Sequence, residues 1–164
     1  MKYKISEPIL ITGSSGFIGS NLARKLILLK YDVHLILRKN SNLWRISDLL
    51  HLINVKIHFC DLKNKKNVNL IINSLKPKTI FHLATYGAYS FQNEKNKIKN
   101  NILESSINLI DSCAEIGFDR FVNTGSNSEY GFKKKPMKES DILEPNSFYS
   151  LYKSTVTNYA RFLS

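Results

Sequence analysis

Cysteine is scarce in this chain, which contains only Cys60 and Cys113 among its 164 residues. The two lie far apart, and each stands beside apolar residues. His58 is close to Cys60, but the sequence has no Cys-x-x-Cys pair and no second ligand pair to complete a zinc site. We therefore expect no metal site, and instead two buried structural thiols in a reducing compartment.

Long hydrophobic runs are also absent. No apolar stretch approaches the roughly 20 residues of a membrane-spanning helix, and the polar residues 1–8 do not resemble a signal peptide. The apolar content of 43% is still that of a folded globular protein. The sequence therefore predicts one globular domain with no membrane partner and a cytoplasmic location.

Acidic residues are few relative to basic ones, since 13 Asp and Glu face 24 Lys and Arg, for a net charge of +11. The basic residues are spread along the chain, and the densest cluster, residues 133–135, falls in an expected loop without an aromatic-and-basic binding motif. We therefore expect no nucleic-acid partner, although a basic surface would attract phosphorylated substrates.

Glycine is sparse too, yet Gly13, Gly16 and Gly19 stand at three-residue spacing within residues 9–20, ILITGSSGFIGS. An apolar run precedes them and an amphipathic helical pattern follows. In this context the first glycine allows a sharp turn, the second allows close approach to a pyrophosphate, and the third allows tight helix packing. The stretch predicts a dinucleotide-binding loop.

Apolar runs and amphipathic stretches alternate along the whole chain. Strands are expected at residues 9–12, 33–37, 55–59, 79–83 and 120–124, and helices at 16–30, 43–52, 65–75, 97–116 and from about 147 onward. This alternation predicts an α/β fold of the Rossmann type, a doubly wound and mainly parallel sheet. Residues 125–146 show little periodicity, and so long a loop after a parallel strand is typical of a functional segment.

Candidate catalytic residues lie within this loop and just after it. Tyr149 and Lys153 are four residues apart and share a helix face, so the ammonium can approach the phenol and favour its ionised form. Such a tyrosine can act as an acid or base near neutral pH. Ser126, in a cluster of hydroxyl and amide residues, could share a proton with Tyr149. The alternatives are a surface helix and an ordinary Ser- and Asn-rich turn.

Four motifs occur in order: TGSSGFIG at residues 12–19, Asp61-Leu62, HLAT at residues 82–85, and Tyr149 with Lys153. Together they resemble the extended short-chain dehydrogenase/reductase family, the nucleotide-sugar epimerases and dehydratases, over essentially the whole chain. The resemblance implies an NAD(P) cofactor, a nucleotide-sugar substrate and hydride transfer at C4 of the sugar, in an epimerase or a 4-keto reductase.

The resemblance also implies roles for individual residues. Catalysis would fall to Ser126, to Tyr149 as the acid/base, and to Lys153, which would also bind the nicotinamide ribose. The cofactor would contact Gly13, Gly16, Phe17, Ile18, Gly19, Arg38, Asp61, Leu62, Leu83, Ala84, Thr85, Tyr149 and Lys153. Asn101 matches an asparagine early in the long helix.

Two departures from the family pattern refine these expectations. The stretch after the second strand carries Arg38 and Lys39 where NAD-specific members place a carboxylate, which favours NADP over NAD. The 4,6-dehydratases carry an Asp-Glu pair after the catalytic hydroxyl residue, whereas Asn127 and Ser128 stand here. Elimination chemistry is therefore disfavoured.

Family members are longer, so we expect residues 1–164 to be a truncated NAD(P)-binding Rossmann domain without the C-terminal substrate domain. Two alternatives stay open: half of a split enzyme with a complementing C-terminal chain, and a non-catalytic nucleotide-binding module. The intact Ser126, Tyr149 and Lys153 argue against the second. The resemblance also makes a homodimer plausible, through the helices at 97–116 and around Tyr149.

Overall fold

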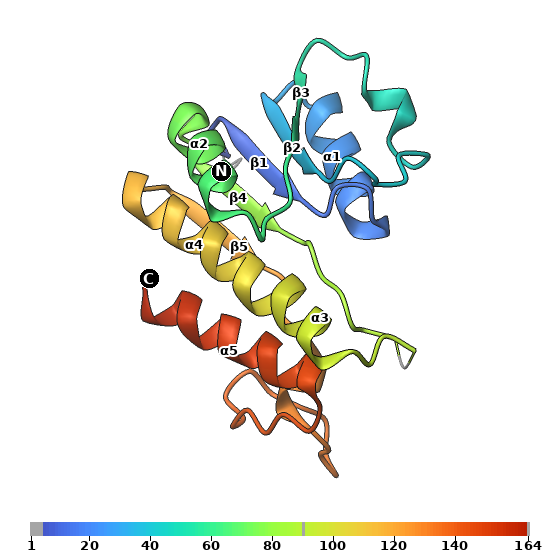
Figure 1. Ribbon diagram of the computed structural model, residues 1–164, viewed down its shortest axis with the longest axis vertical. Coiled ribbons are helices and arrows are strands. Elements are labelled where there is room, and N and C mark those ends of the chain that lie inside the picture. The colour runs from blue at the N-terminus through green and yellow to red at the C-terminus, as the bar shows by residue number, and fades with distance from the viewer. Residues whose placement is uncertain (1–4, 90, 164) are drawn as a thin grey trace.

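The computed structural model describes residues 5–89 and 91–163 and contains a five-stranded, fully parallel sheet (Figure 1). The strands are β1 (Ile9–Thr12), β2 (Val33–Leu37), β3 (Val55–Phe59), β4 (Thr79–His82) and β5 (Arg120–Asn123), in the order β3-β2-β1-β4-β5. This is the doubly wound order, in which the direction of strand addition across the sheet reverses between β1 and β4. The predicted Rossmann-type fold is confirmed, with β4 and β5 each ending one residue earlier than expected.

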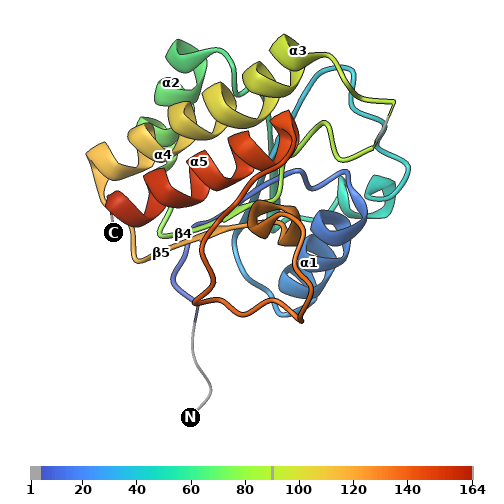
Figure 2. The ribbon, with the colours of Figure 1, turned by 90° about the horizontal axis from the view of Figure 1, so that it is seen from below.

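Helices cover both faces of the sheet. They are α1 (Phe17–Leu28), α2 (Lys65–Leu75), α3 (Lys95–Lys99), α4 (Ser105–Ile116) and α5 (Phe148–Phe162). In Figure 2, α1 lies on one face and α2, α4 and α5 on the other. Neighbouring residues of β1 alternate between the two cores: Ile9 and Ile11 pack on the α1 side, and Leu10 packs with Leu109 of α4. All four residues of β1 are buried, which explains its continuous apolar run.

The prediction of a helix at residues 43–52 is wrong. That segment forms successive three-residue turns, in which Ile46 N donates to Leu43 O and Leu49 N donates to Ile46 O, each at 2.9 Å. Regular helical structure there is limited to a short 3₁₀ turn, η1 (Ser47–Leu49). The apolar side chains recur every three residues, which suits a 3₁₀ pattern and not the 3.6-residue period of an α-helix. Ile46 and Leu49 are buried by these turns.

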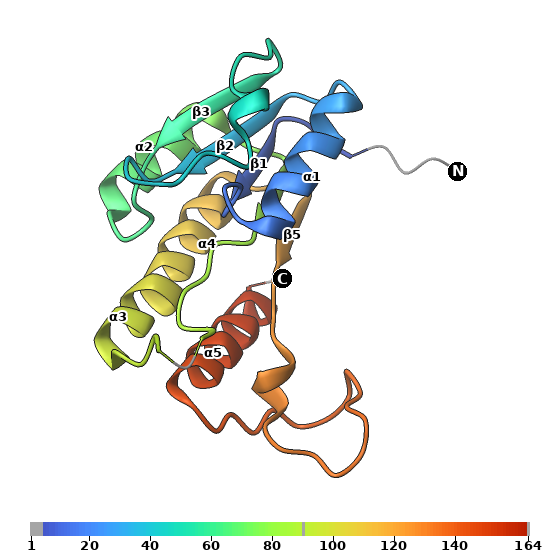
Figure 3. The same ribbon diagram turned by 90° about the vertical axis from the view of Figure 1, so that its right-hand side faces the viewer.

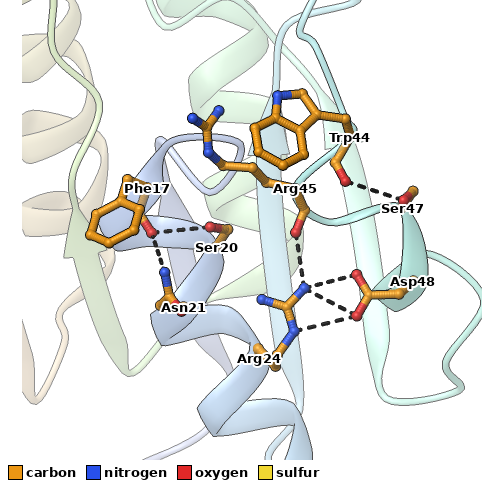
Figure 4. A network of polar contacts seen from close by, with 8 residues as sticks. All are labelled: Phe17, Ser20, Asn21, Arg24, Trp44, Arg45, Ser47 and Asp48. Carbon is orange, nitrogen blue, oxygen red and sulfur yellow. Dashed lines mark hydrogen bonds and ion pairs between the residues drawn. The ribbon is translucent and has the colours of Figure 1, made fainter.

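Contacts from α1 hold this segment against the domain (Figure 4). The Arg24 guanidinium donates to the Asp48 carboxylate at 2.8 Å and to the Arg45 carbonyl at 2.9 Å. The Arg45 guanidinium lies 4.2 Å from the centre of the Trp44 ring, which is 63% exposed. The ion pair is exposed to solvent, so we expect it to contribute little to the stability of the fold.

The helix expected at residues 97–116 is interrupted. It begins two residues earlier, as α3, passes through a π-helical turn, η2 (Asn100–Glu104), and continues as α4. The Ser105 hydroxyl donates to the Asn100 carbonyl, five residues back, at 2.9 Å. Such turns insert one residue into a helix and are frequent at functional sites.

The last helix begins where the sequence predicts. Ser147 caps α5, since its hydroxyl accepts from Ser150 N at 3.1 Å. Before it, residues 131–147 form an irregular loop that extends beyond α5 in Figure 3, preceded by a 3₁₀ turn, η3 (Asn127–Tyr130). The predicted long loop is therefore present.

Three further expectations can be compared with the described part of the chain. None of its helices is both long and apolar enough to cross a bilayer. Within the same residues, no group of three or more His, Cys, Asp or Glu side chains is arranged to hold a metal ion. Cys60 and Cys113 are both buried, as expected, and both are free thiols.

Candidate functional site

A cleft opens at the carboxyl ends of the strands, where the order of strand addition reverses between β1 and β4. The loops that follow β1, β2, β3 and β4 all contribute to its walls. Its lining includes Gly13, Gly16, Arg38, Asp61, Leu62, Leu83, Ala84 and Thr85, together with Asn101 from η2. Eight residues predicted to contact the cofactor are thus brought to one cleft, at the position where doubly wound sheets bind ligands.

The glycine loop after β1 is shaped by close backbone contacts. Gly13 has φ +71°, and a β-carbon there would lie 2.7 Å from the Ala84 nitrogen. A β-carbon on Gly19 would lie 2.3 Å from the Gly13 carbonyl oxygen. Gly16 meets less resistance, with its nearest neighbour at 3.2 Å. Gly13 and Gly19 are therefore required by the fold, and a side chain at Gly16 would need a smaller adjustment of the loop.

The start of α1 faces this loop with unsatisfied backbone donors. Its N-cap is Gly16, and among the described residues no side chain caps it and no acidic residue lies in its first turn. Free N–H groups at a helix N-terminus attract anions such as a pyrophosphate. The Phe17 and Ile18 side chains are 74% and 61% exposed and do not line the cleft. Any contact of these two residues with a pyrophosphate would come from their N–H groups.

Two charged residues line the cleft. Arg38 is exposed just beyond β2, where its backbone N–H donates to the Ser41 hydroxyl at 3.1 Å. The Asp61 carboxylate accepts from the Lys63 N–H at 3.0 Å and pairs with the Lys63 ammonium at 3.4 Å. Asp61 therefore has a local counter-charge, whereas Arg38 lines the cleft as an exposed cation.

Beneath the cleft, His82 links three elements. Its Nδ1 lies 2.7 Å from the Thr12 hydroxyl on β1, and its Nε2 lies 2.8 Å from the Ser106 hydroxyl on α4. Burial, assisted by the charge of Lys153, lowers the pKa of His82 to about 3. The imidazole is therefore neutral, with one nitrogen donating and the other accepting. Sequence reasoning used His82 only as part of a motif and did not foresee this role.

A second hollow lies beside the start of α5. Its lining combines the segment after β4, the η3 turn and the first residues of α5, and includes Gly87, Gln92, Ser126, Ser128 and Tyr149. The Ser126 and Ser128 hydroxyls are 2.7 Å apart. The structure thus brings Ser126 and Tyr149, two of the three predicted catalytic residues, to one surface.

Lys153 takes a different position. Its side chain is buried, and its ammonium donates to the Thr124 carbonyl at the end of β5. It lines neither the cleft nor the hollow. Burial lowers the pKa of Lys153, and the negative charge of Glu129 opposes that shift. Lys153 lies one helical turn after Tyr149 on α5.

Sequence reasoning missed Glu129. This residue is only 3% exposed, and its Oε1 accepts from the Ser126 N–H at 2.7 Å. Ser126 in turn caps the η3 turn, because its hydroxyl accepts from Ser128 N at 3.3 Å. The spacing Ser126-x-x-Glu129 is the signature of a capping box, and that signal could have identified the residue.

Comparison with known proteins assigns the family. The model of the NAD dependent epimerase/dehydratase family matches residues 9–163. The chain belongs to this family. The resemblance seen in the sequence is thereby confirmed.

Relatives in this family carry out several reactions. The chain is 29% identical to a dihydroflavonol 4-reductase of Hordeum vulgare over 82% of its length, and 32% identical to a GDP-mannose 4,6 dehydratase of Cricetulus griseus over 93%. The structure of the UDP-Glc/GlcNAc 4-epimerase of Campylobacter jejuni matches 95% of the chain with a TM-score of 0.87 and 24% identity. The chain covers 39%, 44% and 48% of these proteins, so it spans less than half of each.

Proposed function

We propose that residues 1–164 are the NAD(P)-binding domain of a longer enzyme, an epimerase or 4-keto reductase acting on a nucleotide-activated sugar. One observation carries the proposal: the glycine-lined cleft at the switch point of the sheet lies in the same chain as a hollow that joins Ser126 and Tyr149. Family membership supports the cofactor class, since the family is NAD dependent. The names of the dehydratase and epimerase relatives support a nucleotide-sugar substrate.

The cleft fits a dinucleotide. The uncapped start of α1 and the loop at Gly16 would hold the pyrophosphate, and the loop after β3, with Asp61, would lie along the adenosine half. When bound, the nicotinamide would accept or return a hydride at C4 of the sugar.

The chain's own residues would move the proton. In the oxidative direction the Tyr149 phenolate takes the proton of the C4 hydroxyl and becomes a neutral phenol, while the Ser126 hydroxyl holds that oxygen by a hydrogen bond. The Lys153 ammonium, one turn along α5, would stabilise the phenolate that must be present before this step. Reduction of a 4-ketone reverses these steps.

Elimination of water from the sugar is disfavoured. The two positions after Ser126 are Asn127 and Ser128, neither of which is a general acid at neutral pH. The next residue, Glu129, is buried and directs Oε1 toward the backbone N–H of Ser126. Although several relatives are GDP-mannose 4,6-dehydratases, we propose that this chain retains only the hydride-transfer part of that chemistry.

We also propose a preference for NADP. Arg38 lines the cleft just after β2, where a guanidinium can pair with a 2′-phosphate through two hydrogen bonds. Arg38→Ala should weaken NADPH binding about tenfold or more and NADH binding much less. Arg45→Ala, which removes a nearby guanidinium stacked on Trp44, is the matched control. Equal losses for the two cofactors in Arg38→Ala would refute the preference.

The catalytic assignment is tested in the full-length protein. Tyr149→Phe removes only the phenolic oxygen, so turnover of the nucleotide sugar should fall by about 10²-fold or more while cofactor affinity is retained. Tyr152→Phe makes the same chemical change three residues along α5, on a side chain packed against Phe148, and should leave turnover nearly intact. Unchanged turnover in Tyr149→Phe would refute the assignment.

A further inference from the structure

Glu129 is an ionisable group in an environment that normally excludes one. Its side chain is 3% exposed, although it lies in a short turn between two loops. A buried carboxylate is costly unless hydrogen bonds or a nearby positive charge compensate for its lost hydration. The structure provides both.

The hydrogen bond is made to the backbone of Ser126. Glu129 Oε1 accepts the Ser126 N–H at 2.7 Å, while the Ser126 hydroxyl caps the same turn. Gly125 allows this close approach, because a β-carbon on it would lie 3.1 Å from the same oxygen. The carboxylate therefore determines the position of the Ser126 backbone and, through it, the direction of the hydroxyl.

The positive charge is the ammonium of Lys153. This side chain is also buried, and its ammonium donates to the Thr124 carbonyl, two residues before Ser126. Lys153 interacts electrostatically with the Glu129 carboxylate from η3 and the neutral His82 imidazole from β4, and Tyr149 lies one turn earlier on α5. Glu129 is the anion of this set, and it lines a hollow together with Glu139 and with Arg161 of α5.

We propose that Glu129 is a positioning residue that acts on two catalytic groups at once: its carboxylate orients the Ser126 loop by a hydrogen bond and supplies a negative charge to the buried Lys153 ammonium. This inference rests on the proposed function, in which Ser126 and Lys153 take part in the chemistry. The two actions of Glu129 depend on different properties of one side chain. The hydrogen bond needs an acceptor oxygen, and the counter-charge needs ionisation.

Substitutions separate the two actions. Glu129→Gln keeps an acceptor oxygen of the same reach and removes the charge, whereas Glu129→Ala removes both. Glu104→Gln is the control, because Glu104 forms an exposed ion pair with Lys99 at 3.1 Å. Each protein is labelled with ¹³C at lysine Cε, and the Lys153 signal, assigned with Lys153→Arg, is followed against pH by NMR. This measurement needs neither cofactor nor turnover.

In Glu129→Gln the midpoint of the Lys153 NMR titration should fall by roughly one pH unit or more relative to the parent chain, because a buried ammonium loses a nearby negative charge. The Ser126 amide signal should stay near its parent position in Glu129→Gln and move in Glu129→Ala. Glu104→Gln should change neither signal. A Lys153 midpoint that is the same in Glu129→Gln and the parent would overturn the counter-charge, and an unmoved Ser126 amide in Glu129→Ala would overturn the orienting role.

Failure of this inference is distinguishable from failure of the proposed function. If Tyr149→Phe in the full-length protein leaves turnover intact, the catalytic assignment is refuted, whatever the result of the Lys153 titration. If turnover depends on Tyr149 but the midpoint of the Lys153 titration is the same in Glu129→Gln as in the parent chain, the proposed function stands and the inference is refuted. If both hold, Glu129→Gln in the full-length protein should also shift the pH profile of turnover.

Discussion

Mild acid should destabilise this domain through His82. The imidazole is buried between the Thr12 and Ser106 hydroxyls and beside the Lys153 ammonium, and its pKa is lowered to about 3. In the unfolded chain the same group binds a proton near pH 6.5. Between these values the unfolded state binds more protons than the folded state, so the free energy of unfolding falls as the pH falls.

The magnitude follows from proton linkage. One histidine that stays neutral in the fold costs about 1.4 kcal/mol for each pH unit below about 6.5, hence about 2 kcal/mol between pH 6.5 and pH 5. His34 and His58 add to this in the same direction, because burial lowers the pKa of each. His34 Nδ1 and His58 Nε2 are 2.8 Å apart, so protons on both of these nitrogens would break the hydrogen bond between the two rings.

The assay is urea unfolding at pH 7.5, 6.5, 5.5 and 5.0, with the free energy of unfolding plotted against pH. His82→Gln replaces the imidazole by an amide that does not titrate, so the slope below pH 6.5 should decrease by about 1.4 kcal/mol per pH unit. His51→Gln, at an exposed position, is the control and should keep the parent slope. A free energy that is constant from pH 7.5 to 5.0, or an unaltered slope in His82→Gln, would refute the reasoning.

Two further predictions concern the cleft and the thiols. Gly19→Ala should destabilise the fold by about 1–3 kcal/mol, since its β-carbon would meet the Gly13 carbonyl at 2.3 Å, while Gly16→Ala, whose β-carbon would meet the same oxygen at 3.2 Å, should cost less; equal losses would contradict the loop geometry. Burial raises the pKa of Cys60 and raises that of Cys113 to about 12, so both thiols should react slowly with a disulfide reagent at pH 8 and rapidly in urea. Rapid reaction of the native protein would contradict this.

The strands were predictable from sequence because one physical rule determines them. The inner strands β1 and β2 are buried along their whole length between helix-covered faces and therefore read as short apolar runs. β1, β2 and β3 have the expected bounds. The sheet order then follows from alternation with helices. The segment at 43–52 was predicted wrongly because its three-residue apolar spacing is close to the helical period, and only its backbone hydrogen bonds distinguish the two.

The cleft was more predictable than the catalytic residues. Residues after successive parallel strands must meet at one sheet edge, so Arg38, Asp61 and Ala84 could be assigned to it from their places in the sequence. Where Lys153 directs its ammonium depends on the Thr124 carbonyl, a tertiary contact that no local pattern encodes. The burial of Glu129 could not be predicted for another reason, since it depends on a turn within a loop that has no periodicity.

Titration of the purified chain with NADPH and NADH tests the central claim most directly. Binding is followed by calorimetry and, independently, by the change in nicotinamide fluorescence. The account predicts saturable binding of one molecule per chain, tighter for NADPH, which excess NADP⁺ displaces. Absence of saturable binding of either cofactor to the folded chain would contradict the assignment of the cleft.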